Sequence, residues 1–461
     1  MGQKPSTPKG TRDLLPQEVA KRNYIFDTIR SCFEKYGFLA IETPSFEYSS
    51  TLMGKYGEEG DRLIFRILNS GEKVLKADKQ ALEDRNVSRF ANSLAEKALR
   101  YDLTVPFARF VVQHQNELAL PFKRYQIQPV WRADRPQKGR YQEFYQCDAD
   151  AVGSDSLLLE LDFVQIFDEV LNKLNIPDFT IKINNRKILS GIAEVCGESE
   201  RIVDITVAID KLDKIGVDGV IEELTKKGIS AQAIEKIQPL FAMNGSGFER
   251  LEAMKAYLGD SEIGQEGIRE LSFVLSSMKD LGVVDPKLEF DVTLARGLNY
   301  YTGAIFEVKA NGVNIGSICG GGRYDDLTGT FGMKGTSGIG ISFGADRIFD
   351  VLEELNLFPE SVSDSLDLML INFGEKEALG LLPYLKLWRS TGLRVEIYPD
   401  SAKMNKQMKY ANKRNVLMVG FCGSEELEKG KIKLKDMQSG DQVNVSLDQV
   451  ADHLISSECL R

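Results

Sequence analysis

The chain has 461 residues, of which 43% are hydrophobic and 27% are charged, and its formal net charge is −10. This length predicts about three domains with a buried core, and the composition is typical of a soluble globular protein. The acidic balance argues against a protein that coats nucleic acid without specificity, although a local basic patch remains compatible with it.

The cysteines and histidines exclude further classes of protein. The six cysteines are scattered, with no Cys-x-x-Cys pair, so neither a zinc site nor a disulfide framework is indicated. Such usage suits a reducing compartment, and we expect a cytoplasmic protein. The only two histidines, His114 and His453, do not stand beside a candidate nucleophile, which argues against a Ser-His or Cys-His hydrolase.

Membrane association is also not expected. No apolar run reaches the length of a membrane span, and the start of the chain lacks the apolar segment of a signal peptide. Residues 1–6 formally match a myristoylation pattern, but there is no second membrane signal to support a stable anchor.

The first part of the chain predicts a helix over 17–36, a short strand over 38–41, and then a polar pattern within 99–110. Asp102 and Thr104 alternate with apolar or aromatic neighbours, so we expect a strand with both polar side chains on one face. Such a strand is either half-exposed or part of a small polar site that holds an ammonium group.

A hairpin is predicted next, with strands over 124–132 and 143–152 and a cationic loop over 133–140. In the second strand, Phe144, Gln146, Asp148 and Asp150 share one face. So polar a face is either exposed to solvent or the floor of a polar pocket. The aromatic ring of Phe144, combined with an arginine, could hold a flat base.

Residues 185–282 change to short charged helices separated by glycines. They lack the arginine-and-aromatic strand pattern that surrounds them. We therefore expect an inserted helical domain, and its sequence does not indicate a function.

The most informative stretch is 294–307, where Arg296 and a glycine precede two tyrosines and a β-branched, aromatic run. This order predicts a turn that leads into a strand. Arg296 is either an ordinary solvated residue or a fixed cation for an anion, because arginine keeps its charge at physiological pH. The arginines at 132 and 347 favour the second interpretation.

Two glycine-rich stretches follow, over 319–327 and 335–348. Their glycines allow close approach of a ligand or a neighbouring strand, although a tight turn would explain them as well. The second stretch predicts a strand of small residues that leads into a helix carrying Arg347. Neither stretch is a Walker loop or a dinucleotide-binding fingerprint.

After a linker over 359–365, strands and helices alternate to the end of the chain, which predicts a small α/β domain. Its second helix, over 401–415, carries cations and no acid. Such a helix is usually a solvated face, but in an acidic chain it is a candidate for contact with a phosphate backbone. The four lysines on this helix are Lys403, Lys406, Lys409 and Lys413.

Taken together, four motifs resemble the histidine–tRNA ligase family of class II aminoacyl-tRNA synthetases. They are Arg-Pro-Gln-Lys-Gly-Arg-Tyr at 135–141, Leu-Ala-Arg-Gly-Leu-Asn-Tyr-Tyr at 294–301, Gly-Gly-Gly-Arg-Tyr-Asp at 320–325 and the glycine-rich strand that leads into Asp346-Arg347; the likeness begins at Lys-Gly-Thr-Arg-Asp, 9–13. The resemblance spans nearly the whole chain. It implies an α+β fold: a seven-stranded antiparallel sheet flanked by helices, an inserted helical domain and a C-terminal α/β anticodon-binding domain.

The resemblance also implies domain boundaries and an assembly. The catalytic domain would occupy 1–185 and 285–358, the inserted helical domain 186–284, and the anticodon-binding domain 366–461. The protein would be a homodimer, with L-histidine, ATP and tRNA(His) as its substrates and no membrane partner.

For ATP, the resemblance implies contacts from the hairpin, its loop and the later helix. The residues are Arg132, Asp134, Arg140, Phe144 and Arg347. Phe144 and Arg347 would sandwich adenine, and Arg132 would contact the α-phosphate. Arg132 and Arg296 would be catalytic, and Mg²⁺ would accompany the phosphates.

Histidine and tRNA would be held by further residues. The histidine-binding set implied by the resemblance is Asp102, Thr104, Gln146, Asp150, Tyr300 and Tyr301. The tRNA-binding set is Gln137 and Lys138 of the hairpin loop with the four helix lysines. Three departures concern this site: many family members have Glu where this chain has Asp102 and Asp150, and Asp where it has Asn299.

The implied activity is ligation of L-histidine to tRNA(His) in two steps, through histidyl-adenylate with release of pyrophosphate. The alternative is the family's non-synthetase relative, a regulatory subunit of ATP phosphoribosyltransferase in histidine biosynthesis. That relative typically lacks the anticodon-binding domain and the intact arginine peptide, and both are present here. A synthetase for threonine or proline is disfavoured by the Tyr300-Tyr301 pair.

Overall fold

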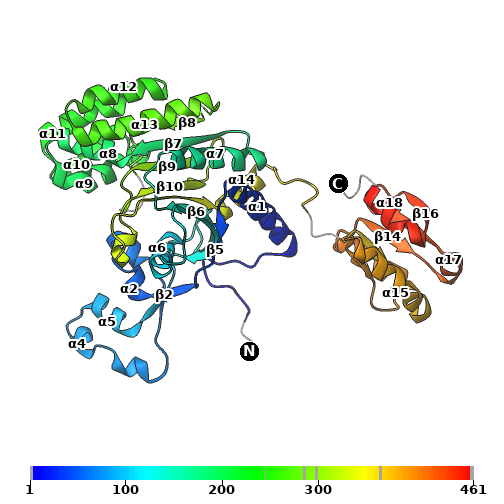
Figure 1. The fold of residues 1–461 in the computed structure, drawn as a ribbon. Helices are drawn as coiled ribbons and strands as arrows, with labels where there is room; N and C mark the ends of the chain where they lie inside the picture. The colour runs from blue at the N-terminus through cyan, green and yellow to red at the C-terminus, as the bar shows by residue number, and fades with distance from the viewer. Residues whose placement is uncertain (1–3, 244, 284–286, 296–299, 363–365, 457–461) are drawn as a thin grey trace. The chain divides into compact units, whose positions relative to one another are not determined.

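The computed structural model describes residues 4–243, 245–283, 287–295, 300–362 and 366–456. It contains two compact units. The first holds residues 1–13 and 22–358, and the second holds residues 14–21 and 359–461. Each unit is described separately below, and Figure 1 gives the element labels.

The first unit is built on a sheet of eight strands in the order β1-β5-β6-β11-β10-β9-β7-β8. Its strands are β1 (Leu39–Ala40), β5 (Phe122–Trp131), β6 (Glu143–Val152), β7 (Phe179–Asn185), β8 (Leu288–Phe290), β9 (Ala304–Ala310), β10 (Cys319–Tyr324) and β11 (Gly338–Gly344). The six central strands pair antiparallel, whereas β1 and β8 add to the two edges in parallel. The expected count of seven was therefore one strand too low. The two edge strands are only two and three residues long, so they leave little strand pattern in the sequence.

Three helices cover one face of this sheet: α1 (Pro16–Lys35), α7 (Leu158–Lys173) and α14 (Ala345–Glu354). Side chains of these helices share one hydrophobic core with Cys147, Ala149 and Ala151 of β6. Since successive side chains of a strand point to opposite faces, Gln146, Asp148 and Asp150 must point away from the helices. The polar face predicted from the sequence is therefore on the opposite side of the sheet.

That opposite side is partly covered by a three-stranded sheet and by short helices. The sheet contains β2 (Phe46–Tyr48), β4 (Lys97–Leu99) and β3 (Arg66–Ile67). The helices are α2 (Ser49–Leu52), α3 (Gly57–Arg62) and α6 (Thr104–Gln113), whereas α4 (Lys79–Glu83) and α5 (Val87–Leu94) pack against each other and project away from the large sheet (Figure 1).

The expected strand over 99–110 was wrong beyond Leu99. Asp102 lies in the turn before α6, and Thr104 is the first residue of that helix. The carboxylate of Asp102 accepts a hydrogen bond from the amide of Val105, three residues later, as a residue that starts a helix does. Pro106 fits the first helical turn, where the missing amide hydrogen is not needed. These helix-start signals outweighed the polar–apolar alternation.

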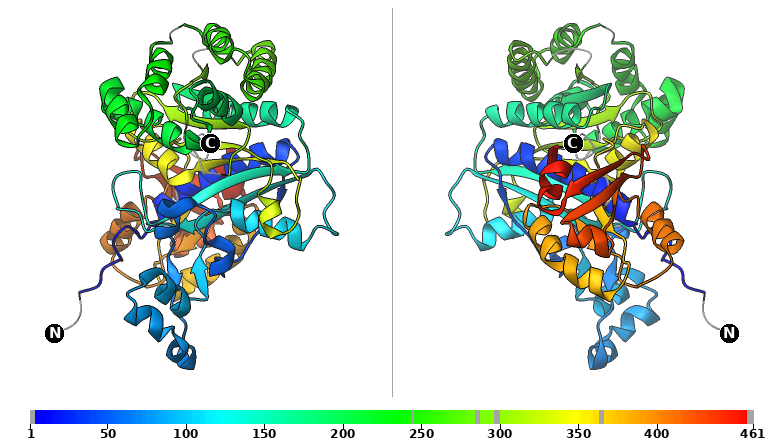
Figure 2. Two further views of the ribbon diagram at one scale, coloured as in Figure 1. Left: turned by 90° about the vertical axis from the view of Figure 1, so that its left-hand side faces the viewer. Right: turned by 90° about the vertical axis from the view of Figure 1, so that its right-hand side faces the viewer.

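Residues 186–280 form six helices, α8 (Arg186–Val195), α9 (Ile202–Ile209), α10 (Leu212–Lys226), α11 (Ala231–Ile237), α12 (Gly247–Leu258) and α13 (Glu262–Asp280). Figures 1 and 2 show these helices gathered beside the β7–β8 edge of the sheet. Their buried side chains belong to the same hydrophobic core as the sheet, for example Val220, Met254 and Leu271.

The second unit contains a five-stranded sheet in the order β13-β12-β14-β15-β16. Its strands are β12 (Leu368–Leu370), β13 (Val395–Ile397), β14 (Met418–Phe421), β15 (Lys431–Asp436) and β16 (Gln442–Ser446). The first three pair in parallel and the last two pair antiparallel. Its helices are α15 (Glu375–Ser390), α16 (Met404–Lys413), α17 (Ser424–Glu428) and α18 (Val450–Ser456). The expected small α/β domain, and with it the α+β fold class, is confirmed.

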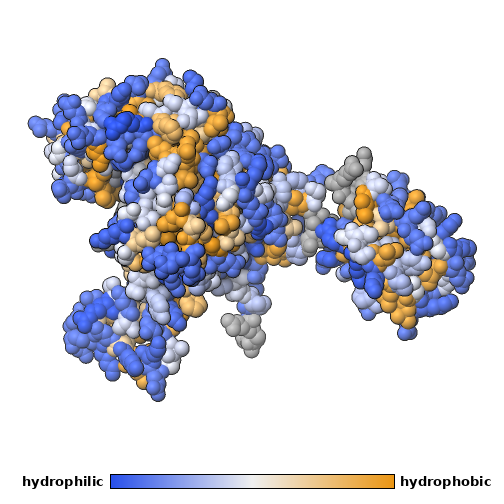
Figure 3. All heavy atoms as spheres, viewed as in Figure 1, coloured by the Kyte–Doolittle hydropathy of each residue, from blue (hydrophilic) through white to orange (hydrophobic). Residues whose placement is uncertain are grey.

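The surface gives no sign of a membrane segment. On the face shown in Figure 3, hydrophilic and hydrophobic residues alternate over both units. Within the described ranges, none of the helices is long and apolar enough to cross a membrane.

Candidate active site

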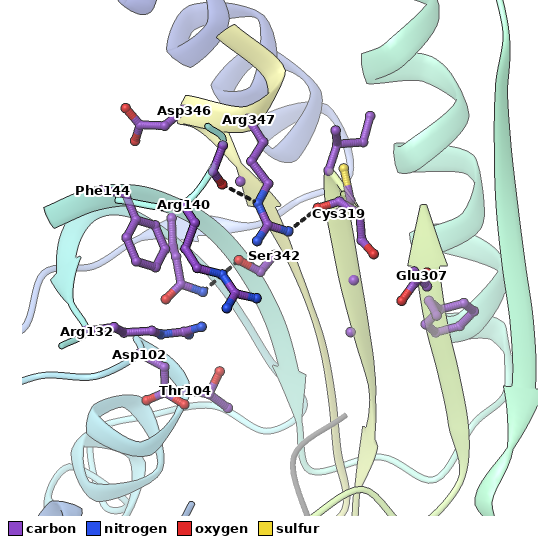
Figure 4. A pocket seen from close by; sticks show the side chains of 18 of the residues that line it. Asp102, Thr104, Arg132, Arg140, Phe144, Glu307, Cys319, Ser342, Asp346 and Arg347 are labelled. Carbon is purple, nitrogen blue, oxygen red and sulfur yellow. Dashed lines mark hydrogen bonds between the residues drawn. The ribbon is translucent and has the colours of Figure 1, made fainter. Parts of the chain in front are cut away.

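A cavity of about 330 Å³ lies on the face of the large sheet opposite α1 and α7. Its walls come from β6, β10, β11, the start of α6, the 133–140 loop and the first turn of α14 (Figure 4). It brings together ten of the residues predicted from the sequence, although they span positions 102 to 347. They are Asp102, Thr104, Arg132, Asp134, Arg140, Phe144, Gln146, Tyr300, Tyr301 and Arg347.

Three arginines line this cavity: Arg132 directly after β5, Arg140 in the hairpin loop and Arg347 on α14 (Figure 4). Nε of Arg132 donates to the carbonyl of Tyr101 at 3.0 Å. Arg347 donates to the carbonyls of Gly139 and Ser317 at 2.8 and 2.6 Å. Burial, followed by the like charges of Arg140 and Arg132, lowers the pKa of Arg347. Since these cations repel one another, an anion between them would stabilise all three.

The ring of Phe144, which is predicted to contact a base, lies beside Arg132 in the same cavity. The guanidinium carbon of Arg132 is 5.3 Å from the centre of the Phe144 ring and 4.2 Å from that of Tyr101. Phe144 and Arg347 both line the cavity. Asp134 lies 3.6 Å from Arg140, so this loop carboxylate partly balances the arginines.

Asp102 provides a negative group in the same cavity, where it lies beside Arg132 (Figure 4). Its side chain is buried, and its Oδ1 accepts hydrogen bonds from the Tyr56 hydroxyl at 2.9 Å and from the Val105 amide at 3.2 Å. Oδ2 is buried and has no hydrogen-bond partner. Burial raises the pKa of Asp102, and the bonds from Tyr56 and Val105 oppose this rise. An unsatisfied buried carboxylate oxygen is costly unless a cationic donor binds it.

Thr104 and Gln146 line the same cavity as Asp102 and add further polar groups to it. The amide nitrogen of Gln146 donates to the hydroxyl of Ser342 on β11 at 2.8 Å, and Oε1 of Gln146 has no partner. Two unsatisfied acceptors, from Asp102 and Gln146, therefore face one cavity. Tyr300 and Tyr301 line the same space, and burial raises the pKa of both phenols, so both remain neutral donors.

Asp150 lies beside the main cavity rather than on it. It lines a small recess of about 20 Å³, whose wall residues Thr104, Tyr301 and Ser342 are shared with the cavity. The carboxylate accepts a 2.7 Å hydrogen bond from the Tyr324 hydroxyl and lies 2.6 Å from the Arg124 guanidinium.

The prediction missed residues that support this site, most clearly Arg124, Tyr324 and Ser342. Tyr324 lies in a glycine-rich stretch that the sequence marked only for its glycines. Arg124 shares its strand parity with Gln126 and Gln128, which signalled a polar face. The contact of Arg124 with Asp150 required the register of the hairpin, where the two residues stand opposite each other.

The remaining predicted residues lie elsewhere. Gln137 bridges to Arg140 within the hairpin loop, and Lys138 forms a 2.5 Å ion pair with Glu354. Arg296 and Asn299 lie outside the described residues. The four lysines on or before α16 belong to the second unit, where all four are exposed and no ion pair forms with them within the described ranges.

Comparison with known proteins agrees with this geometry. The family model for histidyl-tRNA synthetase matches residues 10–78 and 72–348, and the model for the anticodon binding domain matches residues 384–457. Histidine–tRNA ligase from Christiangramia forsetii is 61% identical over 98% of this chain and 100% of its own length. Histidine–tRNA ligase from Bacteroides fragilis is 58% identical over 98% of this chain and 99% of its own length.

A solved structure shows the same fold. The crystal structure of histidyl-tRNA synthetase from Nostoc superposes with a TM-score of 0.81 at 33% identity, covering 98% of this chain and 99% of that one. The relatives and the solved structure cover the chain almost from end to end, and the histidyl-tRNA synthetase model covers well over half of it. The chain therefore belongs to the histidyl-tRNA synthetase family.

Proposed function

We propose that this chain is a histidine–tRNA ligase. It activates L-histidine with ATP to form histidyl-adenylate and pyrophosphate, and it then transfers the histidyl group to the 3'-terminal adenosine of tRNA(His). The observation that carries this proposal is the cavity itself: three arginines line it together with unsatisfied acceptors from Asp102 and Gln146. The arginines match the phosphates of ATP, and the acceptors match the ammonium group of an amino acid.

The arginines fit the first chemical step. The histidine carboxylate is already ionised, so it attacks the α-phosphorus of ATP without a general base. Negative charge grows on the oxygens of the phosphorus in the transition state, and Arg132 with Arg296 stabilises it. Arg140 binds the distal phosphates, with Asp134 at the adenine amine, and Phe144 and Arg347 hold the adenine ring between them.

The polar groups select the amino acid. Asp102, Thr104 and Gln146 accept hydrogen bonds from the ammonium group, and Tyr300 closes the pocket beside them. Asp150 and Tyr301 bind the two ring nitrogens of histidine, because an acceptor and an adaptable hydroxyl together suit a neutral imidazole.

A Mg²⁺ ion bound with ATP would neutralise charge on the phosphates. The carboxylate of Glu307 lines the same cavity, which fits an ion held by phosphates, water and one or two carboxylates.

The tRNA contacts two parts of the chain. Gln137 and Lys138 of the hairpin loop meet its acceptor end, and the α16 lysines contact its backbone near the anticodon. In this proposal 1–185 and 285–358 form the catalytic domain, 186–284 the inserted domain and 366–461 the anticodon-binding domain. The protein acts as a homodimer in the cytoplasm, where its tRNA is found.

The test is the exchange of labelled pyrophosphate into ATP. We expect exchange with histidine and none with threonine or proline, and a loss of at least 100-fold in kcat for Arg132→Ala, the size expected for a charge-stabilising group. Histidine-dependent exchange that survives Arg132→Ala at full rate would contradict the assigned role. Absence of exchange with any amino acid, from folded protein, would favour the regulatory-subunit alternative.

A further inference from the structure

A fully buried arginine lies directly behind the carboxylate that we assign to the histidine ring. Arg124 on β5 stands opposite Asp150 on β6 in the hairpin register. Its Nη2 is 2.6 Å from Oδ2 of Asp150, and the two side chains are 0% and 2% exposed. Because Arg124 does not line the cavity, it can influence a ligand there only through other residues.

The remaining contacts of Arg124 fix its position. Its guanidinium donates to the Gln126 amide oxygen and to the carbonyl of Leu103, each at 3.3 Å, and lies 4.4 Å from the centre of the Phe107 ring. These bonds are longer than the ion pair with Asp150. The ion pair is therefore the main polar interaction of this arginine.

Asp150 is held on its other sides as well. The hydroxyl of Tyr324 on β10 donates to Oδ1 at 2.7 Å. Gly340 on β11 stands opposite Asp150, and a β-carbon at that position would overlap with the carboxylate. The side chain is thus confined to one orientation, in a recess whose wall includes Tyr301.

The buried carboxylate of Asp150 needs a neighbouring cation to stay ionised. Burial raises the pKa of Asp150, whereas Arg124 and then Tyr324 lower it. The neighbouring Asp148 is also buried, and burial raises its pKa to about 7 despite the opposing charge of Arg124. Asp102 adds a third buried carboxyl nearby. Without Arg124, these carboxyls would take up protons at neutral pH, and a protonated carboxyl is a poor acceptor for a ring N–H group.

We propose that Arg124 is a positioning residue for histidine selection: it keeps Asp150 ionised and oriented, so that the site favours a ring that carries an N–H group. This inference rests on the proposed function and assigns the selectivity of the histidine subsite to a residue behind that subsite. Side chains of similar size without a ring N–H group would gain nothing from Arg124.

The test compares Arg124→Leu with the wild-type protein in histidine-dependent pyrophosphate exchange. We expect the KM for histidine to rise about 30-fold, as for loss of a charge-assisted hydrogen bond, while kcat and the KM for ATP stay within about twofold. Inhibition by β-(2-thienyl)alanine, a ring of similar size without an N–H group, should also change less than about twofold. Selectivity for histidine over this analogue therefore falls.

The pH dependence separates this role from a purely structural one. Between pH 7 and 8.5 the KM of Arg124→Leu for histidine should fall as Asp150 ionises, several-fold more steeply than in the wild type. Asp148→Asn, combined with Arg124→Leu, should keep this steeper fall, because the titrating acceptor is Asp150. Arg124→Lys, which keeps the charge, should restore the KM to within about fivefold of the wild type.

Arg109 provides the matched control. Arg109 also forms a 2.7 Å ion pair with a buried carboxylate, that of Glu47. Unlike Asp150, Glu47 lines neither the cavity nor the recess beside it. Arg109→Leu should leave the KM for histidine and its pH dependence unchanged.

Two results would overturn the inference: a wild-type KM and pH profile in Arg124→Leu, or equal losses toward histidine, ATP and the thienyl analogue. If Arg124→Leu does not fold, Tyr324→Phe provides the test, because it removes the other donor to Asp150. This variant should show the same pH dependence, with a rise of about fivefold in the KM for histidine. A wild-type protein without histidine-dependent exchange would instead contradict the proposed function itself.

Discussion

At the scale of single residues, the site depends on carboxylates buried without full compensation. Asp102 has one oxygen with no hydrogen-bond partner, and Asp148 lies beside Asp150 in a sheet interior. Such groups cost stability in the free protein. In the proposed function, a bound ammonium group and a bound ring would supply partners for Asp102 and Asp150.

Asp102→Asn tests the ammonium contact. This change keeps the shape of the side chain and removes its charge, so we expect the KM for histidine to rise about 10- to 100-fold. The KM for ATP should stay within about twofold, because Asp102 is assigned to the ammonium group of histidine and not to ATP. Steady-state pyrophosphate exchange measures both constants, and a KM that rises for ATP but not for histidine would contradict the assignment.

Asp148→Asn tests the cost of the second buried carboxyl. The pKa of Asp148 is raised to about 7, well above its ordinary value, so the folded protein binds this proton more tightly than the unfolded chain does. Stability is therefore lost as pH rises from about 4 to about 7, and Asn avoids this loss. We expect the stability difference between variant and wild type to be about 2 to 3 kcal/mol larger at pH 8 than at pH 5.

Urea denaturation at the two pH values checks this expectation. Arg124 is common to both proteins and stays charged throughout this range. A difference that does not change with pH, or that grows toward pH 5, would show that Asp148 is ionised in the folded protein well below pH 7.

At the scale of elements, β6 determines the layout of the site. Cys147, Ala149 and Ala151 join the hydrophobic core, whereas Phe144 and Gln146 line the cavity and Asp148 and Asp150 line the recess beside it. This alternation was predictable from the sequence, because a strand has a period of two. The hairpin, the strand that leads into α14 and the helices of 186–280 were predictable for similar local reasons.

Other parts of the site were not predictable from local pattern. Asp102 and Thr104 alternate as in a strand, but a hydrogen bond from the Val105 amide shows that a helix begins there. The contacts of Asp150 with Arg124 and Tyr324 depend on strand registers that join residues 26 and 174 positions apart. No short window of sequence contains that information, so these supporting residues emerged only from the structure.

The prediction at this scale concerns tRNA binding by the lysines on or directly before helix α16. Lys403, Lys406, Lys409 and Lys413 recur at intervals of three or four residues, so they form one exposed stripe. Lys406→Glu with Lys409→Glu should weaken tRNA(His) binding about tenfold or more at moderate salt. The slope of log K against log salt should become shallower by about 2, as phosphate contacts are lost.

Pyrophosphate exchange should be unaffected in this double variant, because no lysine of α16 lines the cavity. Lys386→Glu with Lys429→Glu is the matched control in the same unit, and it should change tRNA affinity less than about threefold. Equal effects of the two double variants would mean that net charge, rather than the α16 stripe, determines tRNA binding.

At the scale of the whole molecule, the candidate active site and the proposed contact with the anticodon region of the tRNA lie in different compact units. Residues 22–358 hold the cavity, and residues 359–461 hold the lysine stripe. Variants should therefore separate into two groups, those that lose activation of histidine and those that lose only charging of tRNA.

At this scale we predict that the protein is a homodimer in solution. We expect sedimentation equilibrium to give roughly twice the chain mass of 51.5 kDa at micromolar concentrations. A single species at the chain mass across the concentration range that supports activity would contradict the proposed assembly.

The measurement that tests the central proposal most directly is charging of tRNA by the complete protein. We predict that labelled histidine, with ATP and Mg²⁺, becomes attached to a tRNA(His) transcript, and that tRNA transcripts for threonine and proline remain uncharged with their own amino acids. Omission of ATP, or the change Arg132→Ala, should abolish charging. Folded protein that binds ATP and tRNA(His) but never charges it would contradict the assignment as a ligase.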